Sequence, residues 1–158
     1  MAVTTTPSMS SLIAEVSTTH PTINFTASEW FAWNPDTRTI SYVENGAPAR
    51  LLHELGHADL DHCAYQRDIQ LLEMERDAWD RARQLASDYH CTISDDAVDD
   101  HLDSYRNWLH ARSTCPRCEA LGIQTDAARY TCMECAHAWR VNEARTCELR
   151  RYSENTPV

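Results

Sequence analysis

The clearest hydrophobic pattern in the sequence lies in residues 65–89, a stretch without glycine or proline. Its apolar residues recur at alternating steps of three and four, which places them on one face of an α-helix. These residues are Leu71, Ala78, Ala82, Leu85 and Tyr89. The pattern therefore predicts a long helix over residues 65–89.

A second apolar stripe of the same kind predicts another helix over residues 94–112. Its inward positions are Val98, Leu102, Tyr105 and Leu109. Ser94 is a suitable N-cap, and two aspartates follow it in the first turn. His110 and Arg112 stand in the last turn, where positive charge complements the helix dipole.

The preceding part of the chain reads as a mixture of extended and helical segments. Residues 22–43 contain "TINFT" and "RTISYV", which have the β-branched and aromatic content of strands, with a turn at "NPDT" between them. Gly46 and Pro48 end this region, and we expect a helix over residues 49–60 and a short one over residues 10–16. The expected fold class is α+β: a small antiparallel sheet packed on the 49–60 helix and the long second helix, followed by a third helix and a small ribbon.

Length and composition are those of a globular chain. It has 158 residues, of which 42% are apolar, so a packed core is expected. No apolar run approaches the roughly 18–20 residues of a membrane span, and the N-terminus does not have the pattern of a secretory signal. We expect a cytoplasmic protein with an N-terminal lead-in (1–20), a main domain (21–112), a cysteine-containing module (113–152) and a tail (153–158).

The formal charge of −10 is unevenly distributed. Residues 1–112 carry 18 acidic residues against 8 arginines, whereas residues 113–152 carry 5 acidic residues against 6 arginines. Binding to phosphate backbones needs clustered cations, so only the second part has a charge that permits nucleic acid as a partner.

The segment "LLHELGHADLDH" contains the pattern H-E-x-x-H. On a helix, His53 and His57 lie one turn apart on the same face, so both imidazoles can bind one Zn²⁺. Glu54 stands beside the first ligand, where it can act as general base toward a metal-activated water. Leucines give this helix a buried side, and we expect Gly56 to keep bulk away from the metal.

A catalytic zinc site needs a third protein ligand, and two alternatives arise. A local histidine is the first, but the metzincin pattern would place glycine at Leu60 and histidine at Cys63, so His62 is one residue early. The second alternative is a carboxylate of the 65–89 helix. Glu75 falls on the apolar stripe, whereas Glu73 and Asp77 point about 200° away. A charged group in an apolar stripe is costly to bury without a strong partner, so we favour Glu75 as the third ligand.

"HELGHADLDH" followed by "ERDAWDRA" resembles the ImmA/IrrE family of zinc metallopeptidases over about residues 20–90. That family combines H-E-x-G-H with a downstream helix reading E-x-E-A-N-x-F-A. His53, Glu54, Gly56 and His57 match the first motif, and Glu75, Asp77, Ala78 and Ala82 match the second; Trp79 stands where the family usually has asparagine. The resemblance implies a compact gluzincin-like fold and endopeptidase activity toward repressor-type regulatory proteins.

Peptidases of this class commonly need a hydrogen-bond donor for the tetrahedral intermediate besides the metal. His62, Tyr65 and His90 are the candidates. We favour His62 as this catalytic residue because it follows closely after the H-E-x-x-H helix.

The cysteines predict a second metal site. "CPRC" at 115–118 and "CMEC" at 132–135 form two C-x-x-C pairs separated by 13 residues, a spacing typical of a zinc ribbon. Four ligands leave no open position, so we expect Cys115, Cys118, Cys132 and Cys135 to hold a structural zinc. SprT-type proteases, which join H-E-x-x-H to a C-terminal ribbon and act on DNA-associated proteins, offer a weaker likeness. Six arginines in this module could dock it on DNA or protein, but a plain structural cap remains open.

These patterns together predict a zinc-dependent endopeptidase that cleaves a regulatory or DNA-associated protein substrate, with one catalytic and one structural zinc and no membrane partner. The alternative from a different class is a non-catalytic regulatory module that binds DNA or protein through its ribbon.

Overall fold

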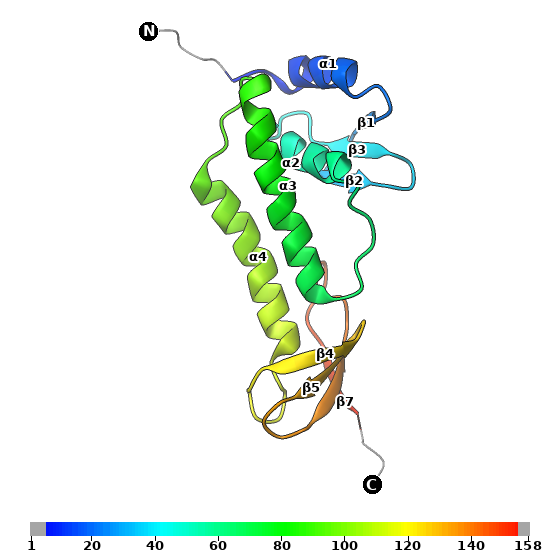
Figure 1. The fold of residues 1–158 in the computed structure, drawn as a ribbon, viewed down its shortest axis with the longest axis vertical. Coiled ribbons are helices and arrows are strands. Elements are labelled where there is room, and N and C mark those ends of the chain that lie inside the picture. The colour runs from blue at the N-terminus through cyan, green and yellow to red at the C-terminus, as the bar shows by residue number, and fades with distance from the viewer. Residues whose placement is uncertain (1–5, 155–158) are drawn as a thin grey trace. The chain divides into compact units, whose positions relative to one another are not determined.

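The structure is a computed structural model that describes residues 6–154, shown in Figure 1. The helices are α1 (Met9–Thr19), α2 (Pro48–Asp59), α3 (Asp68–Asp88) and α4 (Asp95–Ser113). The strands are β1 (Asn24–Ala27), β2 (Ala32–Asn34), β3 (Thr39–Tyr42), β4 (Gly122–Asp126), β5 (Arg129–Cys132), β6 (Ala138–Val141) and β7 (Arg151–Glu154). The predicted α+β class is confirmed, with two small sheets among the described residues.

The described chain divides into two compact units. One contains the residues up to Ala64 together with Met74–Asp99, and the other contains Tyr65–Glu73 together with the residues from Asp100 onward. Helices α3 and α4 therefore contribute to both units. The part of the second unit that contains the four C-terminal strands starts at Asp100, within α4.

The sheet of the first unit has the strand order β1-β3-β2. The predicted turn is present, with the Asn34 side chain accepting hydrogen bonds from the backbone N–H groups of Asp36 and Thr37. It joins β3 to the three-residue strand β2, which sequence analysis did not identify. β2 pairs antiparallel with β3, but β1 pairs parallel with it, so the sheet is mixed rather than wholly antiparallel.

Helix α2 lies against β2 and β3, as Figure 1 shows. It begins at Pro48, because proline has no N–H to leave unpaired in a first turn and its φ is already helical. Helix α2 also packs closely against α3, at Gly56. A Cβ atom there would stand 2.4 Å from the backbone oxygen of Ala78. Gly56 is therefore required for the close crossing of α2 and α3, a different reason from the room beside a metal that we expected.

The second unit contains an antiparallel sheet of order β4-β5-β6-β7. Its inner face carries a small core of apolar residues and cysteines: Cys115, Tyr130, Cys132, Trp139 and Val141. Pairing along β5 and β6 sets Tyr130 opposite Trp139, and their rings stack with centroids 5.7 Å apart. These strands form the ribbon that the cysteine spacing predicts.

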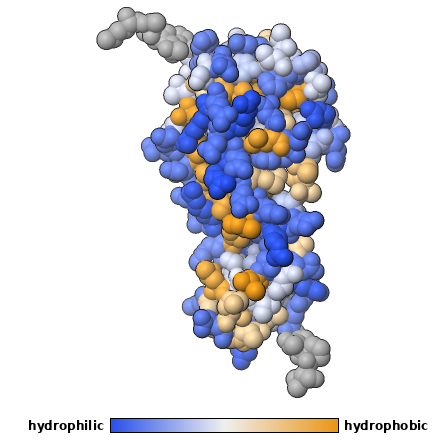
Figure 2. Space-filling model, viewed as in Figure 1, coloured by the Kyte–Doolittle hydropathy of each residue, from blue (hydrophilic) through white to orange (hydrophobic). Residues whose placement is uncertain are grey.

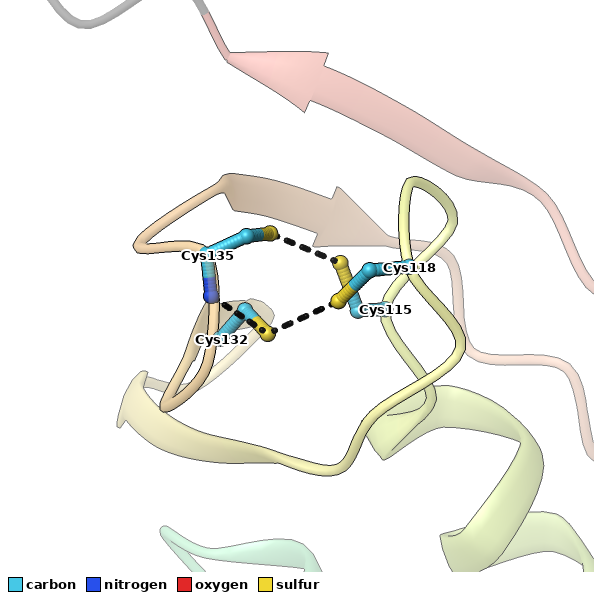
Figure 3. A group of neighbouring side chains, drawn as sticks. All are labelled: Cys115, Cys118, Cys132 and Cys135. Atoms are coloured by element: carbon cyan, nitrogen blue, oxygen red, sulfur yellow. Dashed lines mark hydrogen bonds between the residues drawn. The ribbon is translucent and has the colours of Figure 1, made fainter.

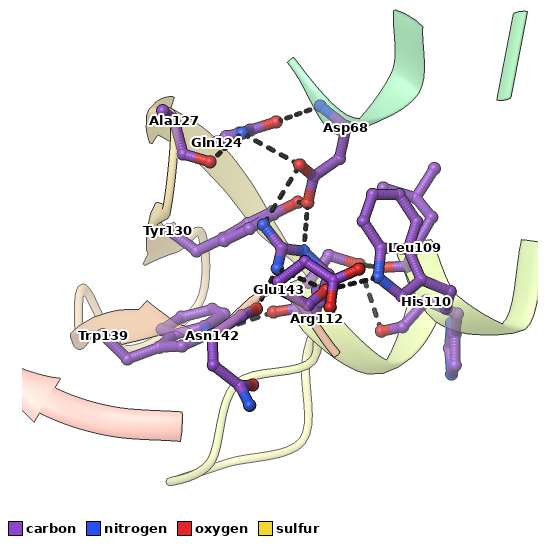
Figure 4. Close-up of polar contacts among 12 residues, drawn as sticks. Asp68, Leu109, His110, Arg112, Gln124, Ala127, Tyr130, Trp139, Asn142 and Glu143 are labelled. Carbon is purple, nitrogen blue, oxygen red and sulfur yellow. Dashed lines mark hydrogen bonds and ion pairs between the residues drawn. The ribbon is translucent and has the colours of Figure 1, made fainter. Parts of the chain in front are cut away.

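A buried ion pair joins the helical segments of the second unit to this ribbon (Figure 4). The Arg112 guanidinium donates to the carboxylate of Asp68 with Nε and Oδ2 2.5 Å apart, and both residues are at most 5% exposed. The Tyr130 hydroxyl also donates to Asp68, and Arg112 donates to the backbone oxygens of Asn142 and Glu143. Arg112 therefore fixes the ribbon, a larger role than the helix-dipole complement that its position in the sequence suggests.

The viewed face in Figure 2 is mostly hydrophilic, with hydrophobic residues in separate small groups. Among the residues that the structure describes, no helix combines the length and apolar character needed to cross a membrane.

Candidate metal centres

Two imidazoles of α2 meet in the interior of the first unit. His53 and His57 are one helical turn apart, which brings their side chains to the same face of α2. Their Nε2 atoms lie 3.2 Å apart, and their rings are nearly perpendicular. His53 is 1% exposed and His57 is 7% exposed. The two nitrogens therefore point at a common position that is shielded from solvent.

Helix α3 brings Glu75 to the same position. One carboxylate oxygen lies 2.9 Å from His53 Nε2 and the other lies 3.4 Å from His57 Nε2. Glu75 is buried, whereas Glu73 and Asp77 are exposed, as the helical phase predicts. A tetrahedral zinc with nitrogen and oxygen ligands at about 2.0–2.1 Å has ligand–ligand separations of about 3.3 Å. The three side chains thus have the donor atoms and the spacing of a metal site.

Trp79 forms one wall of this group. Its ring stacks on the His53 imidazole with centroids 4.3 Å apart and planes 30° apart, and it is 2% exposed. Trp79 is four residues after Glu75, so it shares the inward face of α3. Sequence analysis noted Trp79 only as a departure from a family pattern. Its spacing from Glu75 was the signal that would have placed it beside the histidines.

Burial and hydrogen bonding set the charge states of the group. Burial by itself would raise the pKa of Glu75, but hydrogen bonds from His53 and His57 lower that pKa below its ordinary range. Burial lowers the pKa of His53 from 6.5 to about 4. At neutral pH the group therefore offers an anionic carboxylate and a neutral His53 imidazole, the protonation states that metal ligation requires.

Glu54 has the opposite electrostatic character. Burial raises its pKa from 4.5 to about 7, although the nearby His57 opposes this shift. The backbone N–H of Trp33 in β2 also stabilises its ionised form. A carboxyl group with a pKa near 7 exchanges protons readily at neutral pH, which suits a general acid or base.

Glu54 should make the stability of the metal-free chain depend on pH. Because its folded pKa lies above the unfolded value, its stabilising contribution is complete below about pH 4.5 and is lost as pH rises through about 7. Glu54→Gln does not ionise, so in a chelator the variant should gain on the order of 3 kcal/mol over wild type between about pH 4.5 and 8. Urea unfolding of both proteins measures this gain, and parallel pH curves would contradict it.

His62 lies behind His57. Helix α2 ends at Asp59, and the left-handed Asp61 (φ 51°) turns the chain back on itself. The His62 N–H bonds to the His57 carbonyl and the Asp61 N–H to that of Ala58, the pattern of a Schellman motif. His62 Nδ1 then lies 2.8 Å from His57 Nδ1, the ring nitrogen opposite the shared centre. This contact points to a positioning role for His62, and it gives no support to contact with substrate.

The contact between the two histidines fixes a tautomer. For His57 Nε2 to offer a lone pair to a metal, His57 Nδ1 must carry the proton and donate it to His62 Nδ1. Partial burial lowers the pKa of His62, which keeps its imidazole neutral and able to accept. If His57 binds a metal, His62 would therefore orient its imidazole and raise its basicity.

Removing this acceptor should weaken metal binding without abolishing it. Partners of metal-binding histidines typically contribute about 10–100-fold in affinity, so His62→Ala should lower affinity at this centre by that factor. His62→Gln retains a side-chain acceptor and is the matched control, with a smaller loss. Competition with a chromophoric chelator measures both, and unchanged affinity in His62→Ala would refute the positioning role.

The other local candidates do not contact the three side chains through any described interaction. Cys63 is exposed, and its sulfur lies 4.0 Å from the carbonyl oxygen of Ala64, its neighbour in sequence. His90 is exposed in a left-handed conformation just past α3. Tyr65 belongs to the second unit.

The four ribbon cysteines form a separate cluster, shown in Figure 3. Their sulfurs lie within 4.8 Å of one another, with 3.8 Å between Cys115 and Cys135 and 3.4 Å between Cys118 and Cys132. A tetrahedral site with four thiolates has sulfur–sulfur separations of about 3.8 Å. The distances fit a metal ion and are far longer than the roughly 2.05 Å of a disulfide.

Backbone N–H groups surround two of these sulfurs. Arg117 donates to Cys115, and Glu134 and Cys135 donate to Cys132. The Cys135 and Glu134 N–H groups lower the pKa of Cys132 from 9.0 to about 7, since they favour the thiolate. His137 lies outside the cluster, with its Nε2 3.1 Å from Ser153 Oγ. The four cysteines could hold a metal ion together.

The structure thus brings together all seven side chains predicted as metal ligands, in two groups. His53, His57 and Glu75 lie within 3.4 Å of one another through their side-chain nitrogen and oxygen atoms. The four cysteine sulfurs form the other group. Relatives give no independent guide to their roles. Comparisons of the chain with protein-family models, with curated proteins and with solved structures found no match.

Proposed function

We propose that the protein is a zinc-dependent endopeptidase whose centre is formed by His53, His57 and Glu75. The observation that carries the proposal is the convergence of two imidazole nitrogens and one carboxylate, all buried and 2.9–3.4 Å apart, from α2 and α3. A zinc held by these three protein ligands alone would keep its fourth position for water, which is the arrangement of catalytic rather than structural zinc. The likeness of "HELGH" and "ERDAWDRA" to the ImmA/IrrE family supports the same assignment.

Zinc in this group would polarise the substrate carbonyl and increase the acidity of the attacking water. Glu54 then accepts the proton of that water as its oxygen attacks the carbonyl carbon. The same carboxyl group delivers the proton to the departing amine nitrogen when the C–N bond breaks. A pKa of about 7 allows Glu54 to do both at neutral pH.

The sheet beside this centre supports an extended peptide as substrate. β2 stands at the edge of the sheet, because its described pairing is only with β3. The backbone N–H of Trp33 in β2 acts on the Glu54 carboxylate, so the strand runs close to the proposed base. An extended chain can pair with an exposed strand edge, which would hold a peptide bond near Glu54.

For the ribbon we propose a structural zinc on Cys115, Cys118, Cys132 and Cys135. With four thiolates as ligands no position is left for substrate, so this ion stabilises the fold. The ribbon also gives a candidate docking surface for DNA or protein partners. The substrate class that we favour is a regulatory or DNA-associated protein, as the family resemblance implies.

The Glu54→Gln variant tests the enzymatic proposal. Loss of a general base typically lowers the rate about 10²–10⁴-fold, and glutamine keeps the size of the side chain without accepting a proton. The wild type, loaded with zinc, should hydrolyse protein substrates, while Glu54→Gln binds as much zinc and hydrolyses them at least about a hundredfold more slowly. The inactive variant also serves to capture the substrate for identification by mass spectrometry.

Equal hydrolysis by the two proteins would refute the role of Glu54. Absence of hydrolysis by a wild type that carries zinc at both sites would instead favour the second candidate, a non-catalytic module that binds partners through its ribbon.

A further inference from the structure

Arg50 differs from the other arginines of the first unit. Arg38, Arg76, Arg81 and Arg83 each pair with a carboxylate at 2.7–3.6 Å. Arg50 has no such partner among the described residues, and its Nε is buried without a hydrogen bond. In a chain with a formal charge of −10, carboxylates are abundant, so an arginine left without one is unusual.

The position of Arg50 connects it to the proposed centre. It stands on α2, three residues before His53 and four before Glu54, which puts all three side chains on one side of the helix. Its positive charge acts on both of these residues, lowering the pKa of each. The guanidinium is thus close enough to influence the proposed general base, without forming an ion pair with it.

A packed ring holds Arg50 in place. Its guanidinium carbon lies 5.9 Å from the centroid of the Phe31 ring, the geometry of a cation–π contact. The Phe31 ring in turn packs on Gly46, where a Cβ atom would stand 2.5 Å from it. The absence of a side chain at Gly46 therefore makes room for the ring that supports Arg50.

We propose that Arg50 binds a carboxylate of the substrate, so that the enzyme prefers peptides that are acidic near the cleaved bond. The inference rests on the proposed peptidase function. An arginine held against a ring and lacking an internal partner is prepared for a bidentate bond to a carboxylate. One helical turn separates Arg50 from Glu54, roughly 5.4 Å, which corresponds to about two residues of extended peptide.

Two sources could supply the carboxylate: an aspartate or glutamate side chain, or the C-terminus of the substrate. Both sources present a carboxylate, and binding of synthetic peptides distinguishes between them. Capped alanine-based heptapeptides carrying one glutamate at successive positions, and the same peptides with glutamine, test the side chain. A glutamine peptide with a free acid or an amide at its C-terminus tests the terminus.

Binding is measured to zinc-loaded Glu54→Gln, which does not need to turn over. A charge-assisted hydrogen bond contributes enough that one acidic peptide should bind about tenfold more tightly than its neutral analogue. When Glu54→Gln is combined with Arg50→Gln, the difference in affinity between acidic and neutral peptides should disappear. The control combines Glu54→Gln with Arg83→Gln, which makes the same change of charge at the partly exposed Arg83–Asp95 pair of the same unit. This control should keep the difference in affinity.

Equal affinity for acidic and neutral peptides, or no detectable binding of either, overturns the role of Arg50. So does a preference that survives Arg50→Gln. Cleavage of a mixed peptide pool by wild type separates the two proposals. Hydrolysis without acidic preference contradicts the inference alone, whereas Arg50-dependent binding without hydrolysis contradicts the peptidase proposal alone.

Discussion

Replacing Cys132 with serine is expected to release one zinc per chain and to unfold strands β4–β7. Cys132 is 3% exposed, its sulfur lies 3.4 Å from that of Cys118, and it accepts two backbone hydrogen bonds. Apparent binding energies of structural zinc in small folds are about 10–16 kcal/mol, and serine is a poor substitute for a thiolate. The ribbon core of five residues is too small to compensate for that loss.

Zinc content and hydrogen exchange of the β4–β7 amides measure this result. Cys147→Ser is the matched control, because Cys147 is exposed and its sulfur accepts a hydrogen bond from the Asn142 side chain, outside the group of four cysteines. The control should keep full zinc content and full protection. Protected ribbon amides in a Cys132→Ser chain that has lost this zinc would show that the sheet does not depend on the metal.

Periodicity predicted α3 and α4 because each of these two helices has one clearly apolar face. Ser94 was recognised as the cap of α4, and its Oγ accepts from the Ala97 N–H at 3.4 Å. The same phase argument placed Glu75 on the buried face of α3, where the structure has it at 6% exposure. A charge on an apolar stripe is a strong local signal, since it is unfavourable unless another part of the fold meets it.

The sheet of the first unit was less predictable because its strands are short. β2 has only three residues, of which none is fully buried, so no alternation of apolar and polar positions can be read from it. The parallel pairing of β1 with β3 depends on the path of the chain between them, which residue patterns do not encode. The composition of residues 22–43 therefore predicted extended structure but not its topology.

Two contacts that shape the sites join residues whose roles cannot be predicted from the sequence around each of them. The Asp68–Arg112 pair joins positions 44 residues apart, and either residue alone reads as a helix-terminal charge. The turn at Asp61 places His62 over His57, although aspartate is an uncommon residue at a left-handed helix end. The spacing argument about His62 assumes that the helix continues past Leu60, whereas α2 ends at Asp59.

Replacing Glu75 with glutamine is expected to remove the metal of the first unit and hydrolysis with it. Glutamine keeps the size of the side chain but removes the negative charge that meets both imidazoles at 2.9 and 3.4 Å. Since residues that only support a metal ligand contribute about 10–100-fold in affinity, loss of a ligand itself should cost more than about a hundredfold. Glu75→Gln should therefore purify with one zinc per chain fewer than wild type.

Asp77→Asn is the control for this prediction, because it makes the same change of charge two residues away on the exposed face of α3. It should retain both zinc ions and full activity. His62→Ala should also fill both sites when zinc is in excess, since it weakens the centre without removing a donor. A Glu75→Gln protein with full zinc content, or a His62→Ala protein that cannot be filled, would reverse the assignment of the third ligand. The pair of variants thus separates the carboxylate that meets the metal from the imidazole that orients His57.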